Sequence, residues 1–161
     1  MSENKLNYTM NAFAPTGEIK GRLDLQANID SLSVIIDSTE TGTLTAGTAV
    51  KIVGGSTTIP HVVKATTGGL IHGFIKSSPA KNAFVAGDVV EISYAGDVMY
   101  LEADAAVTAG VSVNVTDFTD MAVKAATGSG STVGWALESA SAAGELIRVL
   151  LTVPVKHTAN S

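Results

Sequence analysis

The side chains that most often carry chemistry in proteins are few in this sequence. Its three histidines, His61, His72 and His157, are spaced too irregularly for a metal-binding motif. His157 lies in a polar C-terminal stretch, and His72 lies in an apolar run, where a structural role is the usual one for histidine. The absence of cysteine excludes disulfides, thiolate metal sites and cysteine nucleophiles. The sequence therefore predicts no metal centre.

Carboxylates and glycines give no stronger signal. Asp97, Glu102 and Asp104 do not follow the D-x-D-x-D-G spacing of a calcium loop, and we expect them in solvated turns. The glycine-rich segments 54–58 and 128–132 lack the lysine and the following helix of a phosphate loop. No G-x-S-x-G nucleophile elbow is present. We therefore expect a protein that is not an enzyme and uses no cofactor.

Composition narrows the class of protein further. The chain has 161 residues, of which 45% are hydrophobic, 5% aromatic and 16% charged, a size typical of one domain. A net charge of −5 argues against nucleic acid as a partner, because phosphate binding requires concentrated lysine and arginine. No apolar run approaches the roughly 20 residues that cross a bilayer, and the first residues lack the apolar segment of a secretory signal. We therefore expect synthesis in the cytoplasm and no membrane partner.

Short β-branched runs separated by glycine-rich turns recur along the chain, and no window holds a long helical period. The expected strands are 31–37, 48–53, 60–65, 70–75 and 88–93. Segment 136–143 has helix-forming residues, but its counterpart earlier in the chain contains Pro79, so we expect a loop. This pattern predicts an all-β sandwich or barrel.

The sequence repeats itself once. Four segments are echoed in the same order about 60 residues later: 45–50 by 108–113, 63–66 by 123–126, 71–75 by 132–136, and 86–92 by 143–149. We interpret residues 45–93 and 108–153 as two copies of one β unit, and we expect them to pack into one pseudo-symmetric barrel or sandwich. Phe74 and Trp135 follow a glycine in each copy and are expected to be paired core positions.

Residues 1–30 differ from the β domain expected over 31–161. Leu6, Tyr8, Met10 and Phe13 are scattered among polar residues, and their alternation has no nearby partner strand. Such a segment is either a frayed tail or an extended arm that orders on a neighbouring subunit. The apolar and aromatic residues favour the arm, because a solvated tail has no need of them.

The end of the second copy resembles a known family. Residues 134–151, Gly-Trp-Ala-Leu-Glu-Ser-Ala-Ser-Ala-Ala-Gly-Glu-Leu-Ile-Arg-Val-Leu-Leu, resemble the C-terminal end of tailed-bacteriophage capsid cement (head decoration) proteins. That end reads G-x-A-L-E-(A/S)-A, then G-(D/E), then (I/V)-R-V-x-L. Residues 108–113 are similar to the T-A-G-x-x-V strand opener of the family. The resemblance extends over about residues 42–153, and the first copy departs from it at 76–79.

The resemblance implies a structural virion protein that decorates and stabilises the outer surface of a phage capsid by bridging subunits of the major capsid protein. It also implies a homo-oligomer, more often a trimer than a dimer. In this reading the arm residues Leu6, Tyr8, Met10 and Phe13 reach a neighbouring capsid or cement subunit. The alternative is a β-sandwich adhesion or carbohydrate-binding module of a phage tail or bacterial surface, which predicts an exposed aromatic cluster or a calcium site.

Overall fold

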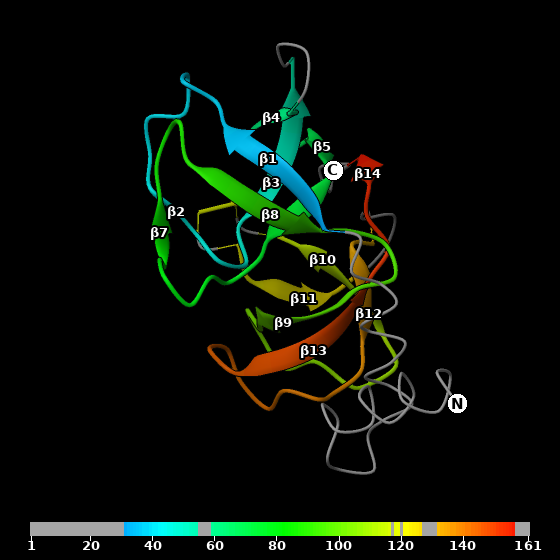
Figure 1. The fold of residues 1–161 in the computed structure, drawn as a ribbon. Coiled ribbons are helices and arrows are strands. Elements are labelled where there is room, and N and C mark those ends of the chain that lie inside the picture. Colours follow the sequence, from blue (N-terminus) through cyan, green and yellow to red (C-terminus); the bar gives the residue numbers. More distant parts are fainter. Residues whose placement is uncertain (1–30, 55–58, 117, 120, 127–131, 157–161) are drawn as a thin grey trace, which may run out of the picture. The chain divides into compact units, whose positions relative to one another are not determined.

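The computed structural model describes residues 31–54, 59–116, 118–119, 121–126 and 132–156, and all of its regular structure is β (Figure 1). The all-β prediction is therefore confirmed. The predicted arm, with Leu6, Tyr8, Met10 and Phe13, lies outside the described residues. The strands expected over 31–37, 48–53, 60–65 and 88–93 are present, and the run over 70–75 is divided into two short strands at His72.

The first half of the domain is a closed five-stranded barrel in the order β1-β4-β3-β6-β8, in which β8 pairs with β1. Its strands are β1 (Leu32–Ile36), β3 (Ala49–Val53), β4 (His61–Lys64), β6 (Gly73–Ile75) and β8 (Val89–Ser93). The β1–β4 pairing is parallel and the others are antiparallel. Three shorter strands accompany the barrel: β2 (Leu44–Thr45), β5 (Leu70–Ile71) and β7 (Ala83–Phe84), with β2 paired to β7.

The second half is a five-stranded sheet in the order β11-β10-β12-β13-β9. Its strands are β9 (Val98–Glu102), β10 (Ser112–Val115), β11 (Val123–Ala125), β12 (Gly134–Ala136) and β13 (Leu146–Leu151). The chain then returns to the first half, where β14 (Val155–Lys156) pairs with β5. Segment 137–143 is a loop with one isolated bridge, as expected.

The two halves have the same strand pairing, so the sequence repeat is a structural repeat. Strands β1, β3, β4, β6 and β8 correspond to β9, β10, β11, β12 and β13. An isolated parallel bridge, Ala103 to Val123, corresponds to the β1–β4 pair Ile36 to Val62. The repeats are therefore longer than the echoes suggested: the first repeat extends over 32–93 and the second over 98–153.

The extra strand changes how the repeats are arranged. Each repeat builds its own five-stranded sheet, and the two sheets share a hydrophobic cluster, so the pseudo-symmetric architecture expected from the repeat is present. The echoes begin after β1 and after β9, so they omit one strand of each unit. With that strand included, the first unit closes into a barrel, and the second forms a five-stranded sheet whose core cluster includes side chains of the first.

One echo is also displaced by a residue. Val50 pairs with Lys64, and the equivalent Val113 pairs with Ala125, so Lys64 corresponds to Ala125 rather than to Lys124. The residue types at 63–65 and 123–125 are the same, but these residues do not occupy equivalent positions in the two repeats. Because side chains alternate along a strand, a shift of one residue exchanges the two faces.

Two hydrophobic clusters hold the domain together. The first fills the barrel: Val34, Ile36, Leu44, Val50, Val62, Ile75, Phe84, Val90 and Ile92. The second is formed mainly by the second repeat, but it includes four buried side chains of the first: Ala49, Ala65, Ile71 and Phe74. The two repeats therefore share a core.

The expectation that Phe74 and Trp135 are paired core residues is wrong for Trp135. The side chain of Phe74 is fully buried in the shared core, whereas 47% of Trp135 is exposed. The two residues occupy equivalent strand positions, since Phe74 pairs with Ala49 and Trp135 with Ser112. The same sheet face is thus covered in the first repeat and open in the second.

Candidate interaction surface

The outer face of the second sheet carries a group of exposed apolar side chains. Among the described residues, eight large hydrophobic side chains are exposed, and four of them lie here. These four, which we call the aromatic face, are Tyr100, Trp135, Leu137 and Leu146. Contiguous exposed apolar surface of this kind marks interaction sites more often than scattered single residues do.

Strand register places these side chains together. Trp135 and Leu137 alternate with buried residues along and just after β12, so both point outward. Arg148 pairs with Tyr100 across β13 and β9, and its carbonyl oxygen accepts the N–H of Leu137 at 2.8 Å. Leu137, Arg148 and Tyr100 therefore form one row across three strands. Leu146 lies two residues further along β13.

Arg148 is the charged group at the centre of the aromatic face. Its Nε donates a hydrogen bond to Oε1 of Glu138 at 2.7 Å, and its backbone N–H donates to Oε2 of the same residue at 3.2 Å. Both side chains remain substantially exposed. A surface with tyrosine, tryptophan and arginine has the composition enriched at energetic centres of protein interfaces.

The fold itself does not require this apolar surface. Ser33 pairs with Glu91, whose carbonyl oxygen accepts the N–H of Lys76, so these three residues occupy the positions of Tyr100, Arg148 and Leu137. The first repeat thus carries serine, glutamate and lysine where the second carries tyrosine, arginine and leucine. A patch of large exposed apolar side chains, unlike a single exposed one, is the informative departure from an ordinary surface.

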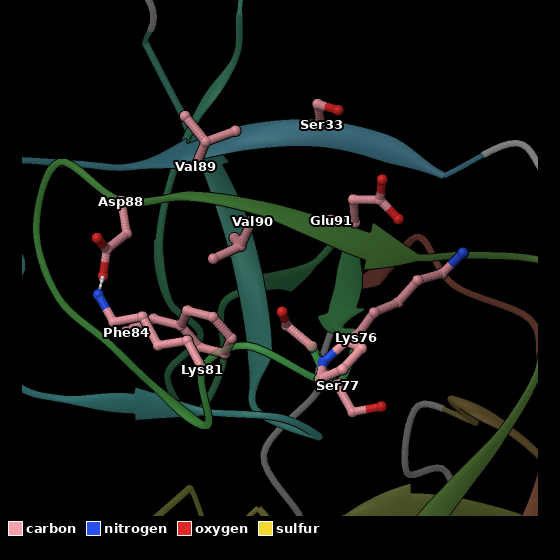
Figure 2. Close-up of a pocket in the computed structure, with 11 residues that line it drawn as sticks. Ser33, Lys76, Ser77, Lys81, Phe84, Asp88, Val89, Val90 and Glu91 are labelled. Atoms are coloured by element: carbon pink, nitrogen blue, oxygen red, sulfur yellow. Dashed lines mark hydrogen bonds and ion pairs between the residues drawn. The ribbon is translucent and has the colours of Figure 1, made fainter.

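The first repeat has a hollow at the same place, which we call the outer groove (Figure 2). Its volume is about 450 Å³. It is lined by Ser33, Lys76, Ser77, Ser78, Pro79, Lys81, Phe84, Asp88, Val89, Val90 and Glu91. Figure 2 shows Ser33 on β1, and Val89 and Glu91 on β8, with an ion pair between Lys81 and Asp88.

A second cavity, of about 470 Å³, joins the two surfaces. Lys76 and Ser77 of the first repeat line it together with Val98, Tyr100 and Leu146 of the second. Lys76 also places Nζ 3.9 Å from Oδ2 of Asp97, in the link between the repeats. The outer groove and the aromatic face are therefore adjacent on the domain.

We expected the three carboxylates near the link to lie in solvated turns, and the structure differs from this expectation. Asp97 is buried, with 8% of its surface exposed, and Asp104 accepts a hydrogen bond from the Thr116 hydroxyl at 3.0 Å. Glu102 is exposed and lies at the end of β9. The sequence had suggested turns because it gave no sign of β9. The expectation of a solvated turn is therefore wrong for Asp97, which is buried, and for Glu102, which lies in a strand.

The described histidines have structural contacts. Nδ1 of His72 accepts the N–H of Ile52 at 3.1 Å, and burial lowers the pKa of this imidazole. Nδ1 of His61 lies 2.9 Å from Oδ2 of Asp37. His157 lies outside the described residues. Within the described ranges, no group of three or more histidine, aspartate or glutamate side chains could hold a metal ion.

Ionisation of Asp37 makes the stability of the folded domain depend on pH. Hydrogen bonds from the Thr39 hydroxyl and backbone N–H, and then from His61, lower the pKa of Asp37 from 3.8 to about 2. Because the folded-state pKa is depressed, the ionised carboxylate stabilises the fold above pH 4 and this contribution is lost as the pH falls toward 2. We expect Asp37→Asn to flatten the acid branch of a melting-temperature profile over that interval. An unchanged slope in the variant would show that Asp37 does not contribute.

The domain so described consists of two similar five-stranded β units with an exposed aromatic face on the second. In the part of the chain that the structure describes, no helix has the length and apolarity to cross a membrane. No protein-family model matches the sequence, and no curated protein matches it. Among solved structures, the fold is similar to the N base of the head fiber gp8.5 of bacteriophage phi29. The TM-score is 0.53 at 15% identity, and the match covers 79% of this chain and 99% of that one.

The sequence-predicted site and the aromatic face consist of different residues. The four arm residues lie outside the described residues, so their role stays a prediction. The aromatic face was missed, although three of its residues, Trp135, Leu137 and Leu146, lie in the second copy as read from the sequence. A signal was present in the comparison of Glu91 with Arg148, where the charge reverses between the copies. Tyr100 gave no such signal, because the strand that carries it was not recognised.

Proposed function

We propose that the protein is a structural component of a phage virion that attaches to the outer surface of the capsid and bridges subunits of the major capsid protein. The observation that carries the proposal is the likeness of its fold to the head fiber N base, over 79% of the chain. The sequence resemblance to capsid cement proteins also points to the phage head and does not depend on the fold. In this proposal the chain acts through its surfaces, without catalysis, and its partners are capsid protein and copies of itself.

The physical character of the domain supports this function. Only 16% of the residues in the whole chain are charged, so few long, mobile side chains lose entropy when the domain is held between partners. A homo-oligomer, with a trimer favoured over a dimer, would present several copies of each surface to the capsid. Individually weak contacts then act together through a high effective concentration.

The experiment uses empty capsid shells that lack the protein, mixed with the purified full chain and sedimented. We expect saturable co-sedimentation at a fixed number of copies per capsomer, and shells that survive higher temperature once saturated. Sedimentation without saturation, or no binding at all, would reject the function. The control is the same assay with the unfolded chain.

The same assay tests the arm. We expect that replacing Leu6, Tyr8, Met10 and Phe13 by serine leaves the β domain folded but weakens capsid attachment by about tenfold or more, a loss of roughly 1.4 kcal/mol. Undiminished attachment would show that these side chains do not contact the capsid.

The exposed aromatic residues favour one second candidate, a carbohydrate-binding module. Trp135 and Tyr100 lie on one sheet face, as a sugar platform requires. A glycan array separates the two functions. Specific glycan binding that is lost in Trp135→Ala, with no capsid binding, would favour the module. Capsid saturation without glycan binding would favour the virion role.

A further inference from the structure

We propose that the aromatic face of one copy of this chain docks into the outer groove of a second copy, with Arg148 of one facing Glu91 of the other. This inference rests on the self-association included in the proposed function and assigns it to two surfaces of the domain. The contact joins different surfaces, so it is heterologous and closes into a ring when the rotation between copies permits.

The first argument is a precedent inside the chain. Phe74 is fully buried where the first repeat packs into the shared core, and Trp135 holds the same strand position on the second repeat. This face of the fold is therefore already used to join one β unit to another. At the second repeat the described chain supplies no further unit to cover it. Another copy supplies one.

The second argument is complementary shape. The aromatic face presents exposed side chains, with 61% of Tyr100 and 64% of Leu146 accessible. The outer groove is a hollow whose lining includes the apolar side chain of Val89, which is 61% exposed. An aromatic side chain that enters such a hollow loses apolar surface to water on both partners.

The third argument is complementary charge. Glu91 and Arg148 hold equivalent positions and have opposite charges. Among the described residues, Glu91 has no ion pair, and the contact of Arg148 with Glu138 uses only Nε of its guanidinium. The remaining N–H groups of Arg148 are free to bind a second carboxylate. A copy that docks through these surfaces gives Glu91 a partner.

A charge exchange tests the pairing directly. We expect Arg148→Glu and Glu91→Arg each to weaken self-association of the full chain by about tenfold or more, because each places like charges in the contact. The double variant Arg148→Glu/Glu91→Arg restores opposite charges and should recover most of the wild-type association. The readout is sedimentation velocity over a concentration series, with circular dichroism and melting temperature as a check on folding.

A second variant removes the apolar contact without risk to the fold. Tyr100→Ser/Leu137→Lys installs the residues that the first repeat carries at the same positions, and both side chains are exposed. We expect this variant to remain folded and to be monomeric at concentrations where the wild type associates. Leu70→Ser is the matched control, because Leu70 is 46% exposed and lies in neither surface.

Three results would overturn the inference. They are a monomeric wild-type chain, an oligomer unaffected by Tyr100→Ser/Leu137→Lys, and single charge variants that the double variant does not rescue. Deletion of residues 2–20 gives a further test. If this deletion abolishes association and the variants of the aromatic face do not, the N-terminal arm joins the copies. Capsid binding is measured separately, so a monomer that still saturates capsids rejects the docking surface and leaves the proposed function standing.

Discussion

Replacement of Phe74 by alanine is expected to lower the free energy of unfolding by about 3–5 kcal/mol, the range for a fully buried phenylalanine. The loss combines the transfer free energy of the ring with the cavity left in the shared core. Trp135→Ala removes a larger side chain from the equivalent position, yet it should cost about 1 kcal/mol or less, because Trp135 is half exposed. Urea unfolding followed by circular dichroism measures both.

The pair of variants also tests whether the two repeats unfold together. Because they share one hydrophobic cluster, we expect a single transition in both variants and in the wild type. Two separate transitions in the wild type would contradict a shared core. Equal destabilisation by the two substitutions would contradict the difference in burial between the repeats.

Strands with a strong local pattern could be predicted from sequence. β1, β3, β4 and β8 are rich in valine and isoleucine and are bounded by turn residues, which is the local chemistry of a strand. β9 was missed, because Val98-Met99-Tyr100-Leu101-Glu102 contains one β-branched residue and lies among the carboxylates of the link. β2, β7 and β14 have two residues each and depend on pairing with distant strands. No local pattern can reveal such strands.

The open face of the second sheet depends on tertiary structure in a different way. Alternation along β12 predicts that Trp135 points to the opposite face of the sheet from the buried Gly134 and Ala136. It does not indicate what covers that opposite face. The cover of the corresponding Phe74 comes from residues of the second repeat, more than 20 positions away along the chain. Residue type therefore indicated a core position for both, and only the packing distinguishes them.

The repeat was visible in sequence because its turns are constrained by backbone geometry. Gly87 and Gly144, with φ of +89° and +88°, precede equivalent strands and adopt a conformation that other residues rarely take. The carboxylates that follow them, Asp88 and Glu145, both accept backbone N–H groups of the same turn. The identity of these residues is fixed locally, so it survives in both copies. The sequence alignment of β4 with its equivalent β11 is not fixed by such a turn, and the match read from the sequence was displaced there by one residue.

A second pair of glycines is constrained by a close approach of strands rather than by φ. A Cβ at Gly134 would lie 2.5 Å from the carbonyl oxygen of Leu150 and 2.5 Å from Cγ1 of Val149, both on the neighbouring strand β13. A Cβ at the equivalent Gly73 would lie 2.6 Å from the carbonyl oxygen of Ser93. These separations are far below van der Waals contact, so the strand backbones must move apart.

We therefore expect Gly134→Ala and Gly73→Ala each to lower the free energy of unfolding by about 1–3 kcal/mol or more, as overpacking against backbone does. Gly54→Ala is the control: its Cβ meets nothing within 4 Å, and its effect should be within about 0.5 kcal/mol. Thermal unfolding of the three variants decides the matter. If Gly134→Ala melts with the wild type while Gly73→Ala does not, the second sheet is looser than the barrel and can move β12 away from β13. Because Trp135 follows Gly134 on that strand, such looseness would also change the shape of the aromatic face, and self-association would weaken in the same variant.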